Sequence, residues 1–176
     1  MSLQANSAIV KIEIYTDGSS LGNPGQGGWW AIIIAEGKKK AISWGEPLTT
    51  NNRMELLAVI EALRYLQEKN APSDNIIIYL DSKYVKQWVE WLPARIHKWR
   101  RLANKKPVAN KDLREQLNVL LPHFAIHRQR VKWHANNEIN NKVDKLARSA
   151  AAKQPIVHPP VKERHVIEKI RGLFDH

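Results

Sequence analysis

The chain has 176 residues, a mass of 20.2 kDa and a hydrophobic content of 43%, which is the range of one globular domain with its own core. Its 28 Lys and Arg against 17 Asp and Glu give a formal charge of +11, which favours a polyanionic partner, with nucleic acid ahead of a membrane surface. The lack of cysteine excludes a disulfide framework, a thiolate metal site and a cysteine nucleophile. No apolar run approaches the ~20 residues that span a bilayer, and the N-terminus has no apolar signal region, so we expect a cytoplasmic protein without membrane contact.

The first half of the sequence predicts three strands and a helix. Alternation over residues 9–16 indicates a half-buried strand that carries Tyr15 and Asp17 on its polar side. A dense turn signal at residues 22–25 follows, and the apolar segments 29–35 and 41–44 flank a Glu-Gly-Lys turn, which predicts a hairpin. Capping side chains at 49–52 precede apolar residues at helical spacing, so we expect a helix to about Lys69.

The second half predicts two more strands and several helices. The continuous apolar run 76–80 is typical of a central strand, and residues 124–133 alternate apolar and basic residues as an edge strand does. Helices are expected at 82–91, around 96–101, at 112–121 and at 140–152. This order describes an α/β domain with a mixed sheet, because the first hairpins are antiparallel and the first helix permits a parallel crossover.

The chain divides into three parts by composition. Residues 1–8 form an N-terminal extension, and residues 9–152 form the folded domain. Proline-containing segments after residue 152 mark a linker, and the basic extension 153–176 could end in one short amphipathic helix. A monomer is the default expectation.

Acidic residues with distinctive surroundings carry the first indication of chemistry. A Tyr-x-Asp pattern ends both apolar strand segments, at 15–17 and at 79–81. If the two strands are parallel neighbours, both aspartates leave the sheet side by side, where open α/β sheets place their active sites. Such a cluster is costly unless divalent cations fill it, and an acidic metal site in a basic protein suggests phosphodiester chemistry on nucleic acid. The candidate residues are Asp17, Glu55, Asp81 and Asp144.

Each of these acids also has an ordinary explanation. Asp17 and the following glycine could form a turn, and Asp81 could cap the next helix. Glu55 could be a first-turn acid that the helix dipole favours, and Asp144 an exposed residue on a helix face. The joint pattern is less easily accidental than any one of its members.

Several blocks of the sequence resemble type-1 ribonuclease H, in the family's order over residues 9–152. The blocks are YTDGS at 15–19, GNPG at 22–25, TTNNRMEL at 49–56, LDSKYV at 80–85, KKPVAN at 105–110, VKWH at 131–134 and VDKLA at 143–147. The resemblance implies the ribonuclease H-like fold, a five-stranded mixed sheet flanked by helices. It also implies a metal-dependent endonuclease that hydrolyses the RNA strand of an RNA–DNA hybrid and leaves 3′-hydroxyl and 5′-phosphate ends.

The resemblance also assigns catalytic roles. It places the family's metal-binding carboxylates on the four acids named above, which would hold two Mg²⁺ ions, with Mn²⁺ as a substitute. His134 matches a mobile histidine that is thought to assist proton transfer or product departure; the alternative is a plain loop histidine.

Substrate contacts follow from the same resemblance. Asn23, Asn51 and Asn52 match residues that contact the minor groove of the hybrid, where 2′-hydroxyls distinguish RNA from DNA. Thr50 and Asn110 match a pocket for a DNA-strand phosphate. Turn and cap roles are the alternative for these five residues. Further contacts are expected from Lys83 and from a basic protrusion, for which the alternative is a solvated basic helix anchored by its tryptophans. The protrusion residues are Trp91, Trp99, Arg100, Arg101, Lys105 and Lys106.

Two other functions stay open at this point. The loop that carries His134 departs from the family's glycine-rich form, with Trp133 and Asn136 where glycines are common, which leaves a catalytically impaired hybrid- or duplex-binding module as an alternative. A related metal nuclease of the same fold, such as a transposase or integrase core, would act on duplex DNA instead.

Overall fold

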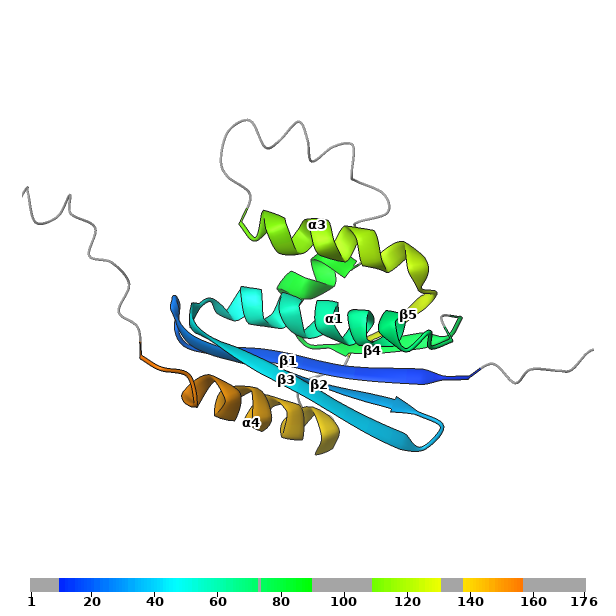
Figure 1. The fold of residues 1–176 in the computed structure, drawn as a ribbon, viewed down its shortest axis with the longest axis horizontal. Coiled ribbons are helices and arrows are strands. Elements are labelled where there is room, and N and C mark those ends of the chain that lie inside the picture. The colour runs from blue at the N-terminus through cyan, green and yellow to red at the C-terminus, as the bar shows by residue number, and fades with distance from the viewer. Residues whose placement is uncertain (1–9, 73, 90–108, 131–137, 157–176) are drawn as a thin grey trace, which may run out of the picture.

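The computed structural model of the protein describes residues 10–72, 74–89, 109–130 and 138–156. Figure 1 shows three layers, with α1 and α3 on one side of a sheet and α4 on the other. In chain order, the elements are β1 (Ile12–Gly22), β2 (Gly25–Ala35), β3 (Lys38–Thr49), α1 (Asn51–Glu68), β4 (Ile76–Leu80), a helical segment at 83–89, α3 (Lys111–Leu120), the 3₁₀ turn η1 (Leu121–His123), β5 (Ile126–Arg130) and α4 (Glu138–Ala152).

The five strands form one mixed sheet in the order β3-β2-β1-β4-β5. β1 pairs antiparallel with β2, and β2 antiparallel with β3, while β4 runs parallel to both β1 and β5. The parallel register places Tyr15 opposite Tyr79, so β1 and β4 run toward the same end of the sheet. The predicted fold class is confirmed, as is the central position of β4 and the edge position of β5.

Helix α1 forms where the sequence predicts it. The side chain of Thr50 accepts a hydrogen bond from the Arg53 N–H at 3.4 Å, which satisfies one of the free donors of the first turn. The helix ends at Glu68, and the N–H of the following Lys69 donates to Tyr65 O. Its apolar residues recur at helical spacing and bury one broad face; the buried side chains are Met54, Leu56, Ala58, Val59, Ile60, Ala62, Leu63 and Leu66.

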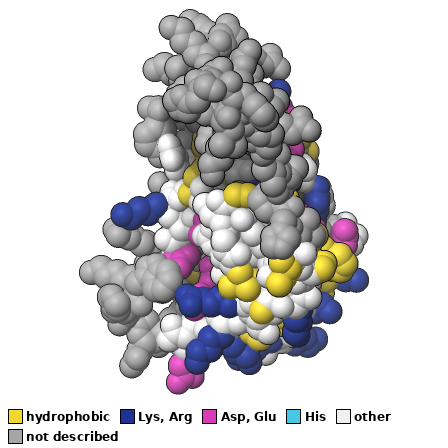
Figure 2. Space-filling model, turned by 90° about the vertical axis from the view of Figure 1, so that its left-hand side faces the viewer, with side chains coloured by type: hydrophobic (Ala, Val, Ile, Leu, Met, Phe, Trp, Pro, Cys, Tyr) yellow, Lys and Arg dark blue, Asp and Glu magenta, His cyan; other side chains and the backbone are white. Residues whose placement is uncertain are grey.

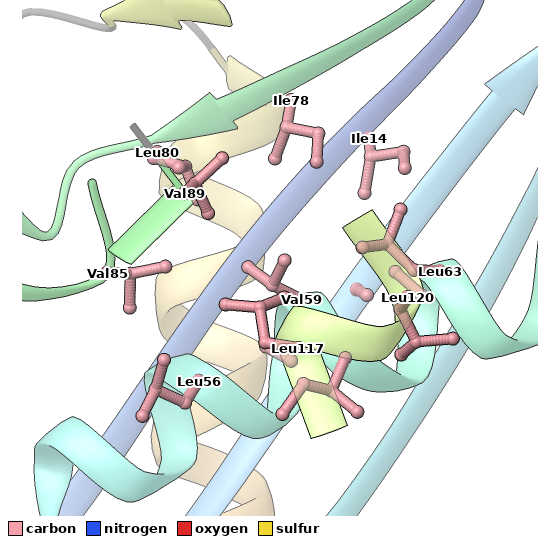
Figure 3. Packing of buried hydrophobic residues seen from close by; sticks show 14 of the residues in the cluster. Ile14, Leu56, Val59, Leu63, Ile78, Leu80, Val85, Val89, Leu117 and Leu120 are labelled. Carbon is pink, nitrogen blue, oxygen red and sulfur yellow. The ribbon is translucent and has the colours of Figure 1, made fainter. Parts of the chain in front are cut away.

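The main core lies between this face of α1 and the sheet (Figure 3). Ile14 of β1 and Ile78 of β4 are fully buried there, and Val59 and Leu63 of α1 pack against the same cluster. Leu117 closes the layer from α3, with 0% of its surface exposed. This continuous contact fixes α1, and therefore the acid at its fifth position, relative to β1 and β4.

A second, smaller cluster on the opposite face corrects one expectation. The alternation of residues 9–16 predicts a half-buried strand, yet Tyr15 is only 6% exposed and packs with Ile32 and Val143. α4 covers this face and buries Tyr15, and the sequence of β1 alone does not indicate that a helix will pack there. Tyr15 also stacks on Tyr79 of the neighbouring strand, with ring centroids 4.2 Å apart.

The strand boundaries differ from those predicted. β1 runs on to Gly22, so Asp17 lies inside the strand, opposite Trp30 of β2. β2 and β3 are likewise longer than the segments 29–35 and 41–44. The reason is the hairpin itself, which supplies hydrogen-bond partners to residues whose own sequence reads as a turn region. The predicted helix around 96–101 lies outside the described residues.

Within the described ranges, none of the helices combines the length and the apolar character that crossing a membrane requires.

Candidate active site

The candidate site lies where β4 ends beside β1, which continues beyond it. Both strands run toward the left side of the molecule in Figure 1, and that side faces the viewer in Figure 2. Asp and Glu side chains gather near the middle of this face, with Lys and Arg side chains beside and below them. A local negative centre therefore lies within a positive surface, as the composition led us to expect.

Asp17 occupies β1 just beyond its last pairing with β4. The pairing with β4 ends at Tyr15, while the pairing with β2 continues through Asp17 and Gly18. The carboxylate Oδ1 of Asp17 accepts a hydrogen bond of 2.8 Å from the Gly18 N–H. Asp17 is therefore held on extended backbone, and the turn role considered for the Asp-Gly pair does not apply.

Gly18 allows α1 to approach Asp17. A Cβ atom at Gly18 would lie 2.2 Å from the backbone nitrogen of Glu55 and 2.3 Å from the carbonyl carbon of Met54. Both are backbone atoms, so no side-chain movement could make room. A glycine at this position is what lets the start of α1 lie against β1 and brings Glu55 beside Asp17.

Both carboxylate oxygens of Glu55 accept hydrogen bonds. Oε1 accepts from Asn51 Nδ2 at 2.8 Å, one turn earlier in α1, and Oε2 accepts from the Ser82 hydroxyl. Since the helix is capped at Thr50, Glu55 lies beyond its first turn, which has no acidic residue. The helix-dipole explanation of Glu55 therefore does not apply.

Asp81 follows β4 directly, and its neighbour takes the capping role. The Val85 N–H donates to the Ser82 hydroxyl at 3.2 Å, and the Lys86 N–H donates to the Ser82 carbonyl at 3.0 Å. Ser82, and not Asp81, is therefore the cap of the helical segment 83–89. The carboxylate of Asp81 therefore does not cap this helix.

Asp144 reaches the site from α4, on the other face of the sheet. Its neighbour Val143 is buried against Tyr15, which fixes this turn of α4 close to β1. The side chain of Asp144 is 29% exposed, and its Oδ1 accepts a hydrogen bond of 2.9 Å from Arg148 Nε. Asp144 is thus a half-buried residue with a local partner, and not a fully solvated one.

The electrostatics show that the four carboxylates form one group. Burial, together with repulsion from its neighbours Asp81, Asp144 and Glu55, raises the pKa of Asp17 to about 8. Burial raises the pKa of Glu55, and the charge of Asp81 adds to the rise, while the hydrogen bonds from Ser82 and Asn51 oppose it. Burial likewise raises the pKa of Asp81, with Asp144 adding to it against two backbone hydrogen bonds. The sequence pattern therefore converges in space as expected.

The four carboxylates are near one another but are not arranged to coordinate a metal ion together. In the part of the chain that the structure describes, no three Asp, Glu or His side chains are arranged so that they could hold a metal ion. Glu55 and Asp144 are instead directed by their hydrogen bonds to Ser82 and Arg148. Mutual repulsion of like charges in a partly buried site favours this separation, and it is relieved by cations.

The predicted groove and phosphate contacts occupy neighbouring places. Asn23, in the turn before β2, accepts a hydrogen bond through Oδ1 from the Asn51 N–H at 3.4 Å, and Asn52 is exposed. Asn110 has a left-handed backbone (φ 54°) at the start of α3, where its side chain makes no capping bond. Its Nδ2 donates instead to the Tyr84 hydroxyl at 3.0 Å.

An ion pair holds the starts of α1 and α3 together. Arg53 Nη1 lies 2.9 Å from Oδ2 of Asp112, and each of these residues follows a cap position, Thr50 or Asn110, by two or three places. The starts of α1 and α3, which carry Thr50 and Asn110, therefore lie beside each other. Lys83 is exposed, and it directly precedes Tyr84, the residue that Asn110 contacts.

The remaining predicted residues lie outside the described residues. They are His134, Trp91, Trp99, Arg100, Arg101, Lys105 and Lys106. The structure also identifies two residues that the sequence did not mark, Gly18 and Ser82. The sequence could have indicated Gly18, because a glycine directly after an aspartate in a strand is unusual. Nothing in the sequence near Ser82 indicates its hydrogen bond to Glu55, 27 positions earlier.

The fold and the acidic group define a nuclease of the ribonuclease H-like class. The sequence model of the RNase H family matches residues 10–152. A Ribonuclease H of Enterobacter sp. (strain 638) is 46% identical over 146 residues, which cover 80% of this chain and 89% of that protein. The chain belongs to the type-1 ribonuclease H family, and it is an endoribonuclease that acts on RNA–DNA hybrids, as the resemblance implies.

Solved structures agree with this assignment. LC9-RNase H1, described as a type 1 RNase H with the type 2 active-site motif, is similar with a TM-score of 0.64 and 26% identity, covering 84% of this chain and 75% of that chain. LC11-RNase H1, solved in complex with RNA/DNA hybrid, is similar with a TM-score of 0.60 and 24% identity, covering 81% of this chain and 98% of that chain. The second likeness bears on the fold alone.

Proposed function

We propose that the chain hydrolyses the RNA strand of a hybrid by a two-metal-ion mechanism. Asp17, Glu55, Asp81 and Asp144 would hold two Mg²⁺ ions, with Mn²⁺ as a substitute. The observation that carries this proposal is the electrostatic coupling of four carboxylates from three layers of the fold, with the pKa of Asp17 raised to about 8. Groups that repel one another in this way are common at functional sites.

The residues present fit hard divalent cations. All four donors are carboxylates, and oxygen ligands are those that Mg²⁺ and Mn²⁺ prefer. Bound cations would offset the burial and the mutual repulsion that raise the pKa of Asp17, Glu55 and Asp81, and would keep these groups ionised at neutral pH. When bound, two such ions stabilise the attacking and leaving oxygens of an in-line displacement, which yields 5′-phosphate and 3′-hydroxyl ends.

The side chains around this group would orient the hybrid. Asn23, Asn51 and Asn52 supply amide donors and acceptors suited to 2′-hydroxyls and base edges in the minor groove. Thr50 and Asn110 would hold a phosphate of the DNA strand and so set the register of the RNA strand over the carboxylates. The ion pair between Arg53 and Asp112 supports this role, since it keeps the two phosphate contacts together. The hybrid complex of LC11-RNase H1 supports hybrid binding by this fold.

Lys83 and several residues beyond the described ranges complete the proposal. His134 would assist proton transfer or product departure. Lys83 and the basic protrusion that includes Trp91, Trp99 and the Arg and Lys residues up to Lys106 would bind phosphates along the hybrid. The catalytic domain would comprise residues 9–152, with extensions at 1–8 and 153–176, in a monomeric cytoplasmic protein without membrane contact.

One comparison tests the mechanism. Wild type and Asp81→Asn are incubated with Mg²⁺ and an RNA–DNA hybrid, duplex RNA or duplex DNA, each labelled on one strand. We expect cleavage of the RNA in the hybrid alone, and a loss of about 10²- to 10³-fold in rate for Asp81→Asn, because one missing electrostatic stabiliser costs on the order of 3–4 kcal/mol. Equal rates for the two proteins would overturn the mechanism. Salt-sensitive binding without turnover by wild type would instead favour the impaired module.

A further inference from the structure

Ser82 joins two parts of the site through a single hydroxyl group. The residue lies between β4 and the helical segment 83–89, immediately after Asp81. Its Oγ accepts a hydrogen bond from the Val85 N–H at 3.2 Å and donates its own proton to Oε2 of Glu55. Both the donor and the acceptor capacity of this hydroxyl are therefore in use.

The two hydrogen bonds to Glu55 are not equivalent. Asn51 lies one turn earlier in the same helix, so its bond to Oε1 holds the carboxylate only relative to α1. Ser82 lies 27 residues away on a different element, and its bond to Oε2 holds the carboxylate relative to the end of β4. Ser82 is thus the contact that fixes Glu55 with respect to Asp81.

We infer that Ser82 is a positioning residue for the metal site, which holds the Glu55 carboxylate in place beside Asp81 by donating a hydrogen bond to it. The inference rests on the proposed function, because it takes Glu55 to be a metal ligand. A glutamate has three rotatable side-chain bonds, and a bond to its outer oxygen removes most of that freedom before a cation arrives. Second partners of this kind change metal affinity by about 10- to 100-fold when they are removed.

The same hydroxyl also caps a helix, so the test must separate the two roles. Ser82→Ala removes both the cap and the bond to Glu55. Ser82→Gly removes the bond to Glu55 but retains most of the capping preference, since glycine at this position costs only a few tenths of a kcal/mol. Ser82→Thr keeps a hydroxyl and should keep both.

The experiment measures metal binding, and not cleavage, in the absence of nucleic acid. Mn²⁺ is titrated into each metal-free variant by calorimetry, and a thermal melt is recorded alongside. We expect Ser82→Ala and Ser82→Gly to bind Mn²⁺ about 10-fold more weakly than wild type, and Ser82→Thr to bind within about twofold of it. Weaker binding by Ser82→Ala with wild-type binding by Ser82→Gly would assign the effect to the cap and overturn the inference.

Variants of Glu55 distinguish this inference from the proposed function. Glu55→Gln alone should weaken Mn²⁺ binding, and adding Ser82→Gly to it should weaken binding no further, because the two residues act through one carboxylate. If Glu55→Gln binds weakly while Ser82→Gly binds as wild type does, Ser82 has no positioning role and the metal assignment stands. If Glu55→Gln binds as wild type does, the metal assignment of Glu55 fails and the role of Ser82 fails with it.

Discussion

Arg148 donates a hydrogen bond of 2.9 Å from Nε to Oδ1 of Asp144, one turn earlier on α4. This pair sets a basic side chain directly on a carboxylate that we propose as a metal ligand. A cation that binds Asp144 must displace or outweigh the guanidinium. We therefore expect this pair to weaken metal binding at Asp144.

Replacing Arg148 should strengthen metal binding. In Arg148→Gln the competing charge is lost, and because exposed pairs of this kind contribute about 0.5–1 kcal/mol, Mg²⁺ should bind about two- to fivefold more tightly. Calorimetric titration of the protein without nucleic acid measures this. Lys145→Gln is the matched control, since it removes the same charge from α4 and leaves the pair between Arg148 and Asp144 intact. Equal gains in both variants would point to net charge instead of competition.

The raised pKa of Asp17 predicts a pH-dependent stability in the absence of metal. Because its pKa rises from 3.8 to about 8 in the folded state, the native protein binds a proton more tightly than the unfolded chain does. The free energy of unfolding should therefore fall as the pH rises between these two values, and should level off above about pH 8. Asp17→Asn removes this loss, so at pH 8 it should be more stable than wild type by at least about 1 kcal/mol.

Urea unfolding at pH 5 and pH 8 with a chelator present checks this prediction. Asp17→Asn should gain more at pH 8 than at pH 5, while Glu55 and Asp81 preserve part of the pH dependence, since their pKa values are raised too. A gain that is the same at both pH values would mean that Asp17 is not protonated in the native state. Saturating Mg²⁺ should reduce the difference between the two proteins, because cations stabilise the ionised form.

Gly28 should be intolerant of any side chain. A Cβ atom there would lie 2.3 Å from the Ala151 backbone nitrogen and 2.7 Å from the Ala147 carbonyl oxygen, so α4 would have to move away from the sheet. We expect Gly28→Ala to destabilise the protein by about 1–3 kcal/mol, measured by urea unfolding. It should also lower hybrid cleavage, because α4 carries Asp144.

Gly37 supplies the comparison for Gly28. Its φ of 74° lies in the left-handed region, but a Cβ atom there would meet nothing within 4 Å. Asparagine tolerates this conformation, so Gly37→Asn should change the free energy of unfolding by less than about 0.5 kcal/mol. Comparable losses in the two variants would show that close packing of α4 is not the cause.

Lys83 should contribute to the salt dependence of hybrid binding, and Lys38 should not. Both lysines are exposed, but Lys83 follows the acidic end of β4, while Lys38 begins β3 at the opposite end of the sheet. If Lys83 neutralises a phosphate, Lys83→Ala should lower the slope of log affinity against log salt concentration by about 1. Fluorescence anisotropy with Ca²⁺ in place of Mg²⁺ measures this, and an equal change in Lys38→Ala would indicate general charge alone.

The sequence by itself determined what depends on neighbouring residues. The apolar spacing of α1 and the capping side chains at 49–52 predict the helix almost to the residue, and the run from Ile76 to Leu80 predicts a central strand, because period and capping are local properties. The repeated Tyr-x-Asp pattern likewise led to Asp17 and Asp81, since parallel neighbouring strands bring their carboxyl ends together. The family blocks added Glu55 and Asp144.

Only the tertiary structure decided what depends on contacts between distant segments. β1 continues past Asp17 because β2 offers it partners, and Tyr15 is buried because α4 covers a face that the strand pattern marks as polar. Gly18 matters through the approach of α1, and Ser82 through a glutamate on another element. A local pattern states which side of an element is apolar, but not which segment will pack there, how closely its backbone will come, or which side chain it will bring.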